Sequence, residues 1–345
     1  MKRLIITFTA FFCIIQVSLA QTDKKLLTVS VGFYNLENLF DTINDPTIND
    51  EEFLPTGKNH WTSERYQKKL SNMAYAVSRI GDNLMPIPPM ILGISEIENR
   101  SVVENLVAHD YLKKYNYQIV HYDSPDRRGV DVGLIYNPSY FKVTNSRAHR
   151  LDYSTDTSFR TRDQLVVSGI IYDEPLHIVV CHWPSRRGGE ARSRPLRNAA
   201  ADLSRHIIDS LLSIDANAKI VLMGDLNDDP NDASLLERVN AKSEREAVDS
   251  KSMYNPFYNM YKKGDGSLAY RDAWNNFDQI MVSPALVNSN EKSFKMTAAK
   301  IYNANFLTNT KGQYRGYPFR TFSYGSFIGG YSDHYPVYIL LVKEK

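Results

Sequence analysis

Polar side chains able to bind a metal ion or move a proton recur where short apolar runs of this sequence begin or end. The runs are rich in valine and isoleucine and bounded by Gly, Pro, Asn or Asp, which is typical of β-strands. The polar residues at these positions are Asn35, Glu96, His182, Asp225, Asn227, Asp278, Asp333 and His334. A single acidic strand end means little, but repeated ends that draw on the same four residue types predict one shared site at the rim of a sheet.

The chemistry of these side chains indicates a hard divalent cation. Carboxylate and amide oxygens suit Mg²⁺, with Mn²⁺ or Ca²⁺ as alternatives. Of the two cysteines, Cys13 lies in the N-terminal apolar run, so only Cys181 remains and no cysteine pair is available for a structural zinc ion. Each element also has a purely structural interpretation. Residues 224–230 can form an Asp- and Asn-rich turn, and His182 alone can be a hydrogen-bonded structural histidine. The prediction of a cation site therefore depends on the polar positions occurring together, not on any one of them.

Two groups of residues near these positions could contact an anionic substrate. Arg128, Arg186 and Arg187 are candidate phosphate-binding residues, because guanidinium groups bind phosphates bidentately and Gly188-Gly189 allows a close approach of the loop. The alternative for such arginines is a solvated helix start. Aromatic residues crowd the segment 314–331, where they could stack on bases or fill a small core of the loop itself.

The elements that must position these residues alternate along the chain without a linker or repeat. Strands are expected at 26–34, 90–95, 117–122, 131–136, 164–171, 176–181, 219–223, 277–282 and 336–342. Apolar residues at helical spacing predict one helix from Ser63 to about Ile80 and another from about Pro195 to Leu212. Many strands with few long helices predict an α/β sandwich, in which two sheets pack face to face and helices lie outside. Segments 41–52 and 302–331 are expected as long loops, which are usually functional.

The N-terminus has the pattern of an export signal. Lys2 and Arg3 precede an apolar run, and small residues up to Ala20 suit cleavage before Gln21. The apolar run is shorter than the roughly 20 residues of a membrane span, so we expect no stable span after cleavage. Residues 1–20 are thus predicted to be a signal peptide and 21–345 a single domain that is periplasmic or extracellular. The formal net charge is +2, and its surplus lies in the first 20 residues, so the rest has no global positive field that would attract nucleic acid.

Several short motifs together resemble a known family. These are Asn35–Asn38, Ile94–Ile97, His182–Gly189, Gly224–Asn227, Phe277–Ile280 and Tyr331–His334. In this order they resemble the endonuclease/exonuclease/phosphatase superfamily, which includes pancreatic-type deoxyribonucleases and apurinic-site endonucleases, and they look like an exported bacterial branch of it. The resemblance implies a four-layered α/β/β/α sandwich of two mostly antiparallel sheets. It also implies a divalent cation, usually Mg²⁺, and a catalytic domain that cleaves phosphate esters.

The resemblance assigns roles to the polar residues. It implies that Glu96 is the main metal ligand, completed by Asn35 and Asp333 directly or through water. His334, positioned by Asp278, would lie beside the scissile phosphate, either as a base or as a phosphate-binding cation. Asp225 would orient the attacking water, Asn227 would bind a phosphoryl oxygen or orient the nucleophile, and His182 would be a general acid or an oxyanion donor. One departure is Ser95, which replaces the glutamine that often precedes the metal-binding glutamate.

Three classes of function remain open from the sequence. The first is an exported nuclease that hydrolyses phosphodiester bonds of DNA or RNA. The second is a phosphatase or phosphodiesterase for a small or lipid-linked phosphate, such as an inositol phosphate, a nucleotide or a phospholipid head group. The third is a non-enzymatic binding protein on the same scaffold, which the complete set of polar positions disfavours. The oligomeric state has no signature in the sequence.

Overall fold

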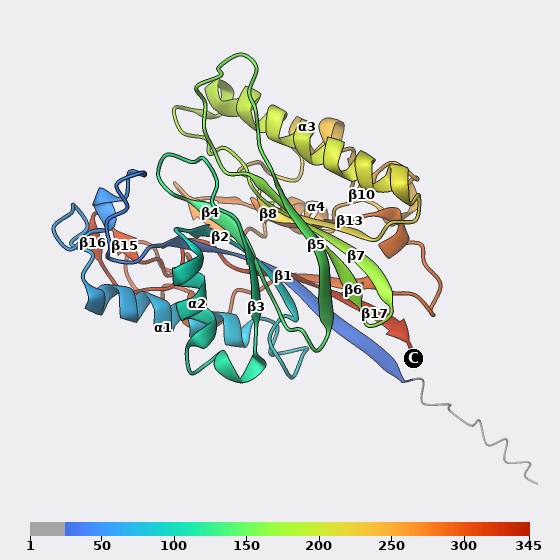
Figure 1. The fold of residues 1–345 in the computed structure, drawn as a ribbon, viewed down its shortest axis with the longest axis horizontal. Coiled ribbons are helices and arrows are strands. Elements are labelled where there is room, and N and C mark those ends of the chain that lie inside the picture. Colours follow the sequence, from blue (N-terminus) through green and yellow to red (C-terminus); the bar gives the residue numbers. More distant parts are fainter. Residues whose placement is uncertain (1–24) are drawn as a thin grey trace, which may run out of the picture.

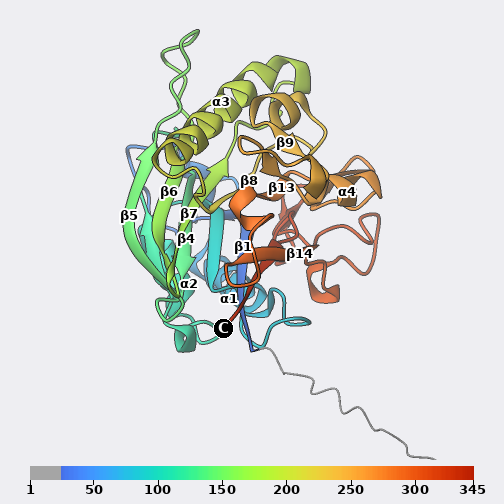
Figure 2. The same cartoon turned by 90° about the vertical axis from the view of Figure 1, so that its right-hand side faces the viewer.

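Two large β-sheets pack face to face, and helices cover both outer surfaces (Figure 1; Figure 2). The structure is a computed structural model and describes residues 25–345. The predicted signal peptide, residues 1–20, lies outside the described residues. Among the residues described, no helix combines the length and the apolar character that crossing a bilayer requires. The four-layered α/β/β/α sandwich expected from the sequence is confirmed.

Six strands form the first sheet, and they run antiparallel except for β1 and β2. Their order is β14 (Lys295–Ile301), β17 (Val337–Glu344), β1 (Leu26–Leu39), β2 (Ile91–Ile97), β4 (Asp131–Tyr136) and β3 (Gln118–His121). The first and last strands of the described chain are therefore neighbours within this sheet.

Seven strands form the second sheet, where β7 and β8 are parallel at the centre and β9 and β10 are parallel at one edge. Their order is β5 (Phe141–His149), β6 (Gln164–Ile171), β7 (Glu174–His182), β8 (Ile220–Asp225), β13 (Asp278–Val282), β10 (Met253–Tyr254) and β9 (Ala241–Lys242). Sequence patterns did not predict β5 and β14, because these edge strands carry many exposed polar or small residues.

Three apolar cores hold the layers together. The central core lies between the sheets and contains alternate residues of the inner strands, such as Val31, Phe33 and Met223. The other two cores bury the outer sheet faces under helices. Because strand side chains alternate between faces, a strand covered on both sides is apolar almost throughout.

Helices α1 (Ser63–Arg79) and α2 (Arg100–Ala108) cover the first sheet, and α3 (Glu190–Ile214) covers the second (Figure 1). α1 begins at the cap Thr62 and turns out of the helix at Gly81, whose φ of 77° is one that glycine adopts readily. α3 begins at Glu190, so the predicted start at Pro195 was wrong. Buried Arg197 donates to Ser193 Oγ at 2.7 Å and to the backbone oxygen of Glu190 at 3.3 Å, and these bonds hold the first turn although Pro195 follows it.

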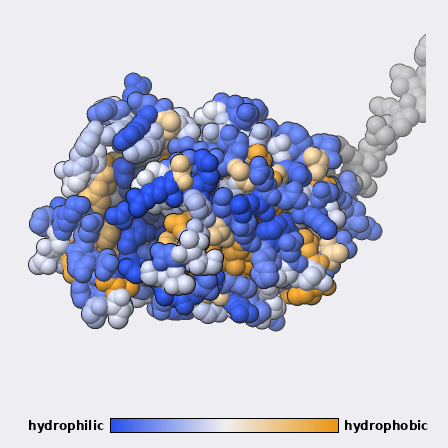
Figure 3. Space-filling model, turned by 90° about the horizontal axis from the view of Figure 1, so that it is seen from above, coloured by the Kyte–Doolittle hydropathy of each residue, from blue (hydrophilic) through white to orange (hydrophobic). Residues whose placement is uncertain are grey.

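Short elements complete the fold. A short helix, α4 (Phe257–Lys262), follows β10, and the hairpins are β11 (Leu268–Tyr270) with β12 (Ala273–Asn275) and β15 (Phe322–Ser323) with β16 (Ser326–Phe327). Single helical turns lie at Glu51–Phe53, Lys113–Tyr115, Ser234–Arg238, Arg245–Ala247, Pro284–Leu286 and Asn305–Leu307. On the face shown in Figure 3, hydrophobic residues form separate patches among hydrophilic ones.

Candidate active site

The strand register of the first sheet places two predicted ligands, Asn35 and Glu96, at the same end of its central strands. β1 and β2 run parallel with Asn35 opposite Ser95, so Asn35 and Glu96 leave the sheet side by side. β17 runs antiparallel to β1 and begins where β1 leaves the regular ladder, with Phe33 opposite Val337. His334 lies in the segment just before β17, so it reaches the same end of the sheet.

The second sheet brings three more predicted residues to the strand ends that face this end of the first sheet. β7 and β8 are parallel with His182 opposite Asp225, and β13 is antiparallel with Asp278 opposite Asp225. The two ends meet, because the Nδ2 group of Asn35 on the first sheet donates a 3.0 Å hydrogen bond to Oδ2 of Asp225 on the second. Segments far apart in the sequence thus form one cluster across the two sheets.

The backbone at these strand ends is irregular in a way that directs side chains into the cluster. Glu37, Asn38, Glu96 and Asn227 all have left-handed φ values, between 48° and 58°. The ladders around β2 shift register at Glu96, as a β-bulge does, and a bulge redirects the side chain it carries. Left-handed conformations at residues other than glycine cost roughly 1 kcal/mol or more and concentrate at functional sites.

Gly224 explains the first position of the Gly-Asp-Leu-Asn motif. A Cβ atom at this position would lie 2.1 Å from the carbonyl oxygen of Cys181 in the neighbouring strand β7. Any larger residue would push β8 away from β7 and separate His182 from Asp225. The glycine is thus required by the close approach of the two central strands.

The centre of the cluster is the group Glu96, His182 and Asp225. Asn35 donates to both carboxylates, at 3.2 Å to Glu96 and 3.0 Å to Asp225, while its oxygen accepts the backbone N–H of Glu37. His182 directs Nε2 toward the same carboxylates, 3.9 Å from Glu96 and 3.6 Å from Asp225. Its Nδ1 atom is buried and has no hydrogen-bond partner among the described residues.

His334 is held beside this group by a second carboxylate. Its Nδ1 atom lies 2.6 Å from Oδ2 of Asp278, and its Nε2 atom lies 3.9 Å from both Asp225 and Asp333. Its own backbone N–H donates to Ser332 Oγ, and that hydroxyl donates to the backbone oxygen of Asn35. The Ser-Asp-His motif is therefore tied to β1, and the imidazole presents Nε2 to the cluster.

Burial and neighbouring charges shift the protonation of these groups in opposite directions. Burial raises the pKa of Asp225 to about 7, with the charge of His334 opposing this and those of Asp278 and Glu96 adding to it. Burial also holds the pKa of His182 well below its usual value, aided by the charges of Arg162 and Arg128. Burial would lower the pKa of His334 too, but Asp278 outweighs it and raises that pKa well above its usual value. His182 is thus a neutral imidazole and His334 a cation at neutral pH.

Asn227 has its amide occupied within the fold. Its side-chain nitrogen donates to the backbone oxygen of Trp183 at 3.0 Å, and its backbone N–H donates to Oδ1 of Asp225. Asn227 therefore holds the Asp225 carboxylate and the end of β7 together, and within residues 25–345 no hydrogen bond engages its side-chain oxygen.

Sequence patterns missed Lys69 and Thr321, which support Glu37 at the end of β1, beside the site. Glu37 accepts hydrogen bonds from Arg320 at 3.2 Å and from the backbone of Thr321 at 2.7 Å, and Arg320 also donates to Asp333 at 3.1 Å. Lys69 of α1 is buried, donates to Thr321 Oγ1 and lies 3.8 Å from Glu37. A lysine three residues after Tyr66 on the apolar face of a predicted helix is the signal that could have identified it.

The residues of the cluster fit a divalent cation. Glu96, His182 and Asp225 each offer one ligand atom, and these atoms lie within 4.8 Å of one another. Metal ligands must be deprotonated, so the Glu96 carboxylate and the neutral imidazole are suitable donors, and a bound cation would favour the deprotonated form of Asp225, whose pKa is about 7. A second group within this limit, Asp225, Asp278 and His334, shares Asp225 with the first. The third group, His121, Asp123 and Asp131, lies outside the site, at the start of β4.

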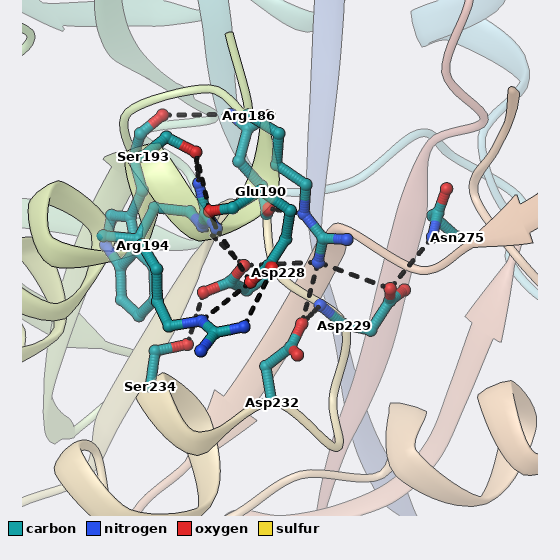
Figure 4. A network of polar contacts seen from close by, with 12 residues as sticks. Arg186, Glu190, Ser193, Arg194, Asp228, Asp229, Asp232, Ser234 and Asn275 are labelled. Carbon is teal, nitrogen blue, oxygen red and sulfur yellow. Dashed lines mark hydrogen bonds and ion pairs between the residues drawn. The ribbon is translucent and has the colours of Figure 1, made fainter. Parts of the chain in front are cut away.

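The structure separates the three arginines expected to bind phosphate. Arg186 contacts Asp228 at 3.2 Å and Asp232 at 2.8 Å, and its Nε donates to the backbone oxygen of Asn227 (Figure 4). Arg128 is exposed and bonded to Asp126, while its charge reaches His182. Arg187 is exposed, and among residues 25–345 no hydrogen bond or ion pair engages it.

Similar solved structures show the same fold. D. rerio TDP2 humanized by 14 mutations has a TM-score of 0.56 and 12% identity, covering 91% of this chain and 98% of that one. D. rerio TDP2 complexed with a single-strand DNA product has a TM-score of 0.53 and 14% identity, covering 91% and 98%. An endonuclease/exonuclease/phosphatase family protein from Bacteroides thetaiotaomicron has a TM-score of 0.52 and 16% identity, covering 93% and 99%.

Sequence comparison gives the family. No curated protein matches the chain in sequence. The profile of the Endonuclease/Exonuclease/phosphatase family matches residues 30–343, which includes every residue of the cluster described above. The chain therefore belongs to the endonuclease/exonuclease/phosphatase family.

Proposed function

We propose that this protein is a divalent-metal-dependent hydrolase of phosphodiester bonds, with nucleic acid as its substrate. The observation that carries the proposal is the joint placement of Glu96, His182 and Asp225 beside the His334–Asp278 pair. Family membership supports phosphoester hydrolysis, and a structural neighbour, D. rerio TDP2, was solved with a single-strand DNA product.

In the proposed site, Glu96 is the main ligand of the cation, which is Mg²⁺ with Mn²⁺ or Ca²⁺ as alternatives. Asp225 and His182 lie beside Glu96, and Asp333 contributes directly or through water. Asn35, whose amide nitrogen faces Glu96 and Asp225, holds these two carboxylates in place and contributes to the cation site through water. A bound cation would neutralise the charge of the phosphate and lower the pKa of the attacking water.

The remaining residues bind and orient the substrate. His334 donates from Nε2 to a phosphoryl oxygen, because Asp278 accepts the proton on Nδ1 and thereby fixes the orientation of the ring. Asp225 orients the attacking water, and Asn227 directs its free side-chain oxygen to the same water. His182 is the candidate donor to the leaving oxygen. Arg187 and Arg128 supply positive charge at the entrance, whereas Arg186 stabilises the Asn227 loop.

The decisive experiment measures hydrolysis of bis-p-nitrophenyl phosphate. We expect Mg²⁺-dependent turnover that EDTA abolishes, and a loss of about 100-fold or more in kcat for His334→Gln, since positioned proton donors and acceptors typically contribute this much. The matched control is His121→Gln, because His121 forms a buried pair with Asp131 at 2.9 Å outside the site. Near wild-type turnover in His334→Gln, or equal losses in both variants, would refute the assignment.

A substrate panel distinguishes the nuclease from the alternative classes. Mg²⁺-dependent cleavage of DNA or RNA supports the nuclease. Release of phosphate from inositol phosphates or nucleotides, without cleavage of nucleic acid, would instead indicate the small-phosphate esterase. Cation binding without hydrolysis of any member of the panel would indicate a binding protein.

Export is a separate proposal that the N-terminal pattern supports. We expect the protein recovered from the periplasm or the medium to begin at Gln21, which mass spectrometry of the intact chain would show. An intact protein that begins at Met1 in the membrane fraction would contradict it.

A further inference from the structure

A cleft lined by aromatic side chains adjoins the site on the side of Asp333. It lies between the tip of the β11–β12 hairpin, the loop that follows Asn309, and the β15–β16 hairpin, and its volume is about 770 Å³. The aromatic residues that line it are Tyr270, Tyr314, Tyr317, Phe322 and Tyr324. We call it the tyrosine cleft. Its lining includes Arg320 and Asp333, so one end reaches the residue that precedes His334.

The aromatic wall is already assembled. The Tyr314 hydroxyl donates to that of Tyr324 at 2.6 Å, and their rings lie 5.8 Å apart. The ring of Tyr317 lies 5.6 Å from Tyr314, and its hydroxyl donates to Asp272 in the opposite hairpin. These contacts fix ring faces without burying them, which reduces the entropy lost when a flat ligand binds.

Part of this wall does not stabilise the fold. Tyr324 has 79% of its surface exposed at the turn of the β15–β16 hairpin, and Tyr270 has 61% exposed. The φ of Tyr324 is 49°, in a two-residue turn where Asn or Gly is favoured. By contrast Phe327 and Tyr331 pack on the core under α1, and Phe322 both packs on that core and lines the cleft. The aromatic segment thus contains residues that fill a core, residues that face the cleft, and one that does both.

The charges along the cleft favour an anionic ligand. Three cations line it, Arg271, Lys311 and Arg320, against the carboxylates Asp272 and Asp333. Arg320 is paired with both Asp333 and Glu37, so Arg271 and Lys311 are the cations that remain, against Asp272, which accepts a hydrogen bond from Tyr317. Arg271 lies over the ring of Tyr270 at 5.1 Å, and Lys311 adds a further positive charge.

We propose that the tyrosine cleft binds an unpaired nucleobase next to the scissile phosphate, so that the substrate is single-stranded nucleic acid. This inference rests on the proposed function. Every nucleobase has a flat face that stacks on tyrosine, and the cations match the flanking phosphates. A base within a duplex is stacked on both faces and paired at its edge, so it cannot enter the cleft.

Binding is tested without hydrolysis, in EDTA, with an oligonucleotide that carries the fluorescent base 2-aminopurine. Stacking should quench its fluorescence, and the duplex form of the same oligonucleotide should compete poorly. Tyr324→Asn suits the turn geometry, so we expect it to keep the wild-type Tm and to lose about tenfold in affinity, because stacking on one aromatic ring is worth about this factor.

Tyr172→Asn is the matched control. Tyr172 has a similar φ of 54° and 43% exposure, but its ring contacts Tyr140 and Phe294 away from the cleft. The affinity of the Tyr172→Asn variant for the oligonucleotide should equal that of the wild type. Equal affinity in Tyr324→Asn and wild type, or equal binding of duplex and single strand, would overturn the inference.

Hydrolysis of bis-p-nitrophenyl phosphate keeps the two proposals apart. Mg²⁺-dependent turnover without any 2-aminopurine quenching would refute the nucleobase cleft and leave the phosphodiesterase intact. Quenching that Tyr324→Asn weakens, without turnover of any phosphodiester, would support the cleft and refute the proposed function.

Discussion

Two acidic clusters begin within three residues of each other at the end of β8, and they differ in how their charges are balanced. Asp225 and Glu96 are contacted by the amide of Asn35 and by histidines, with no lysine or arginine in ion-pair contact among residues 25–345. Asp228, Asp229 and Asp232 are instead bound by arginines (Figure 4).

This difference in charge balance is the reason that we place the chemistry in the first cluster. In the second cluster, Arg197 is fully buried and pairs with Asp228 at 2.5 Å, and the Ser234 hydroxyl donates to the same carboxylate at 2.6 Å. Its charges are satisfied within the fold. The first cluster keeps carboxylates short of positive charge, which a bound cation and a substrate can use. Both clusters are rich in aspartate, so composition alone does not separate them.

The largest expected effect is on stability in the second cluster. Arg197→Met would leave Asp228 buried with one of its two arginines removed, so we expect a loss of about 3 kcal/mol in the free energy of unfolding. Arg194→Met is the control, since Arg194 is 56% exposed and pairs one turn away with Glu190. Its loss should be below about 0.5 kcal/mol. Denaturant unfolding measures both, and equal losses would remove the distinction between the clusters.

The next largest effects are opposite in two neighbouring aspartates: loss of Asp225 should affect kcat, and loss of Asp228 should affect the Tm. We expect Asp225→Asn to reduce kcat about 100-fold or more with an unchanged or higher Tm, because a buried and incompletely compensated charge is removed. Asp228→Asn should lower the Tm and leave the kcat of the folded protein near wild type. Measuring kcat and Tm for both variants tests this prediction. If Asp228→Asn lost as much activity as Asp225→Asn, the two clusters would form one functional unit.

The smallest expected effect is on the pH dependence of stability, through Glu174, an acidic residue outside both clusters that is well paired. Burial opposes ionisation of Glu174, but hydrogen bonds from Lys343, Lys219 and Ser293 outweigh it and lower its pKa from 4.5 to about 2. A folded-state pKa below the unfolded one stabilises the protein fully above about pH 5, and this stabilisation is lost as the pH falls toward 2.

Glu174→Gln should therefore cost about 1 to 2 kcal/mol at pH 7, and the difference from wild type should shrink between pH 5 and pH 2. Glu104→Gln provides the control, because Glu104 is 56% exposed in a surface pair with Arg100. Urea unfolding across this pH range is the measurement. A difference that stays constant with pH would show that packing, not charge, makes Glu174 important.

The fold was largely predictable from the sequence because its central strands are covered on both faces. Runs such as Ile220–Met223 are apolar throughout and admit few other interpretations. The strands β5 and β14 escaped, because edge strands are exposed and their residues show little periodicity. The sequence pattern puts the start of α3 too late, because Pro195 favours a helix start, whereas hydrogen bonds from Arg197 hold an earlier turn.

The candidate site was predictable in its residue types but not in its partners. Motif order identified Glu96, Asp225 and His334, and the structure brings these three together. Motif order could not show that Arg186 is engaged by three aspartates while the adjacent Arg187 is free of ion pairs within the described chain, because the pairing is decided by side chains 42 to 46 residues away. The left-handed φ at Glu96 is likewise a property of the assembled strand ends, not of the local sequence.

The antiparallel pairing of β1 with β17, from Leu26 opposite Glu344 to Phe33 opposite Val337, has a consequence for when the protein becomes active. Closing this ladder joins segments more than 300 residues apart, and such long-range contacts form slowly. Until it closes, His334 has no fixed place beside Asp278 and Asp225. We therefore expect the proposed hydrolytic activity to be absent from a nascent or partly folded chain and to arise only with the native state.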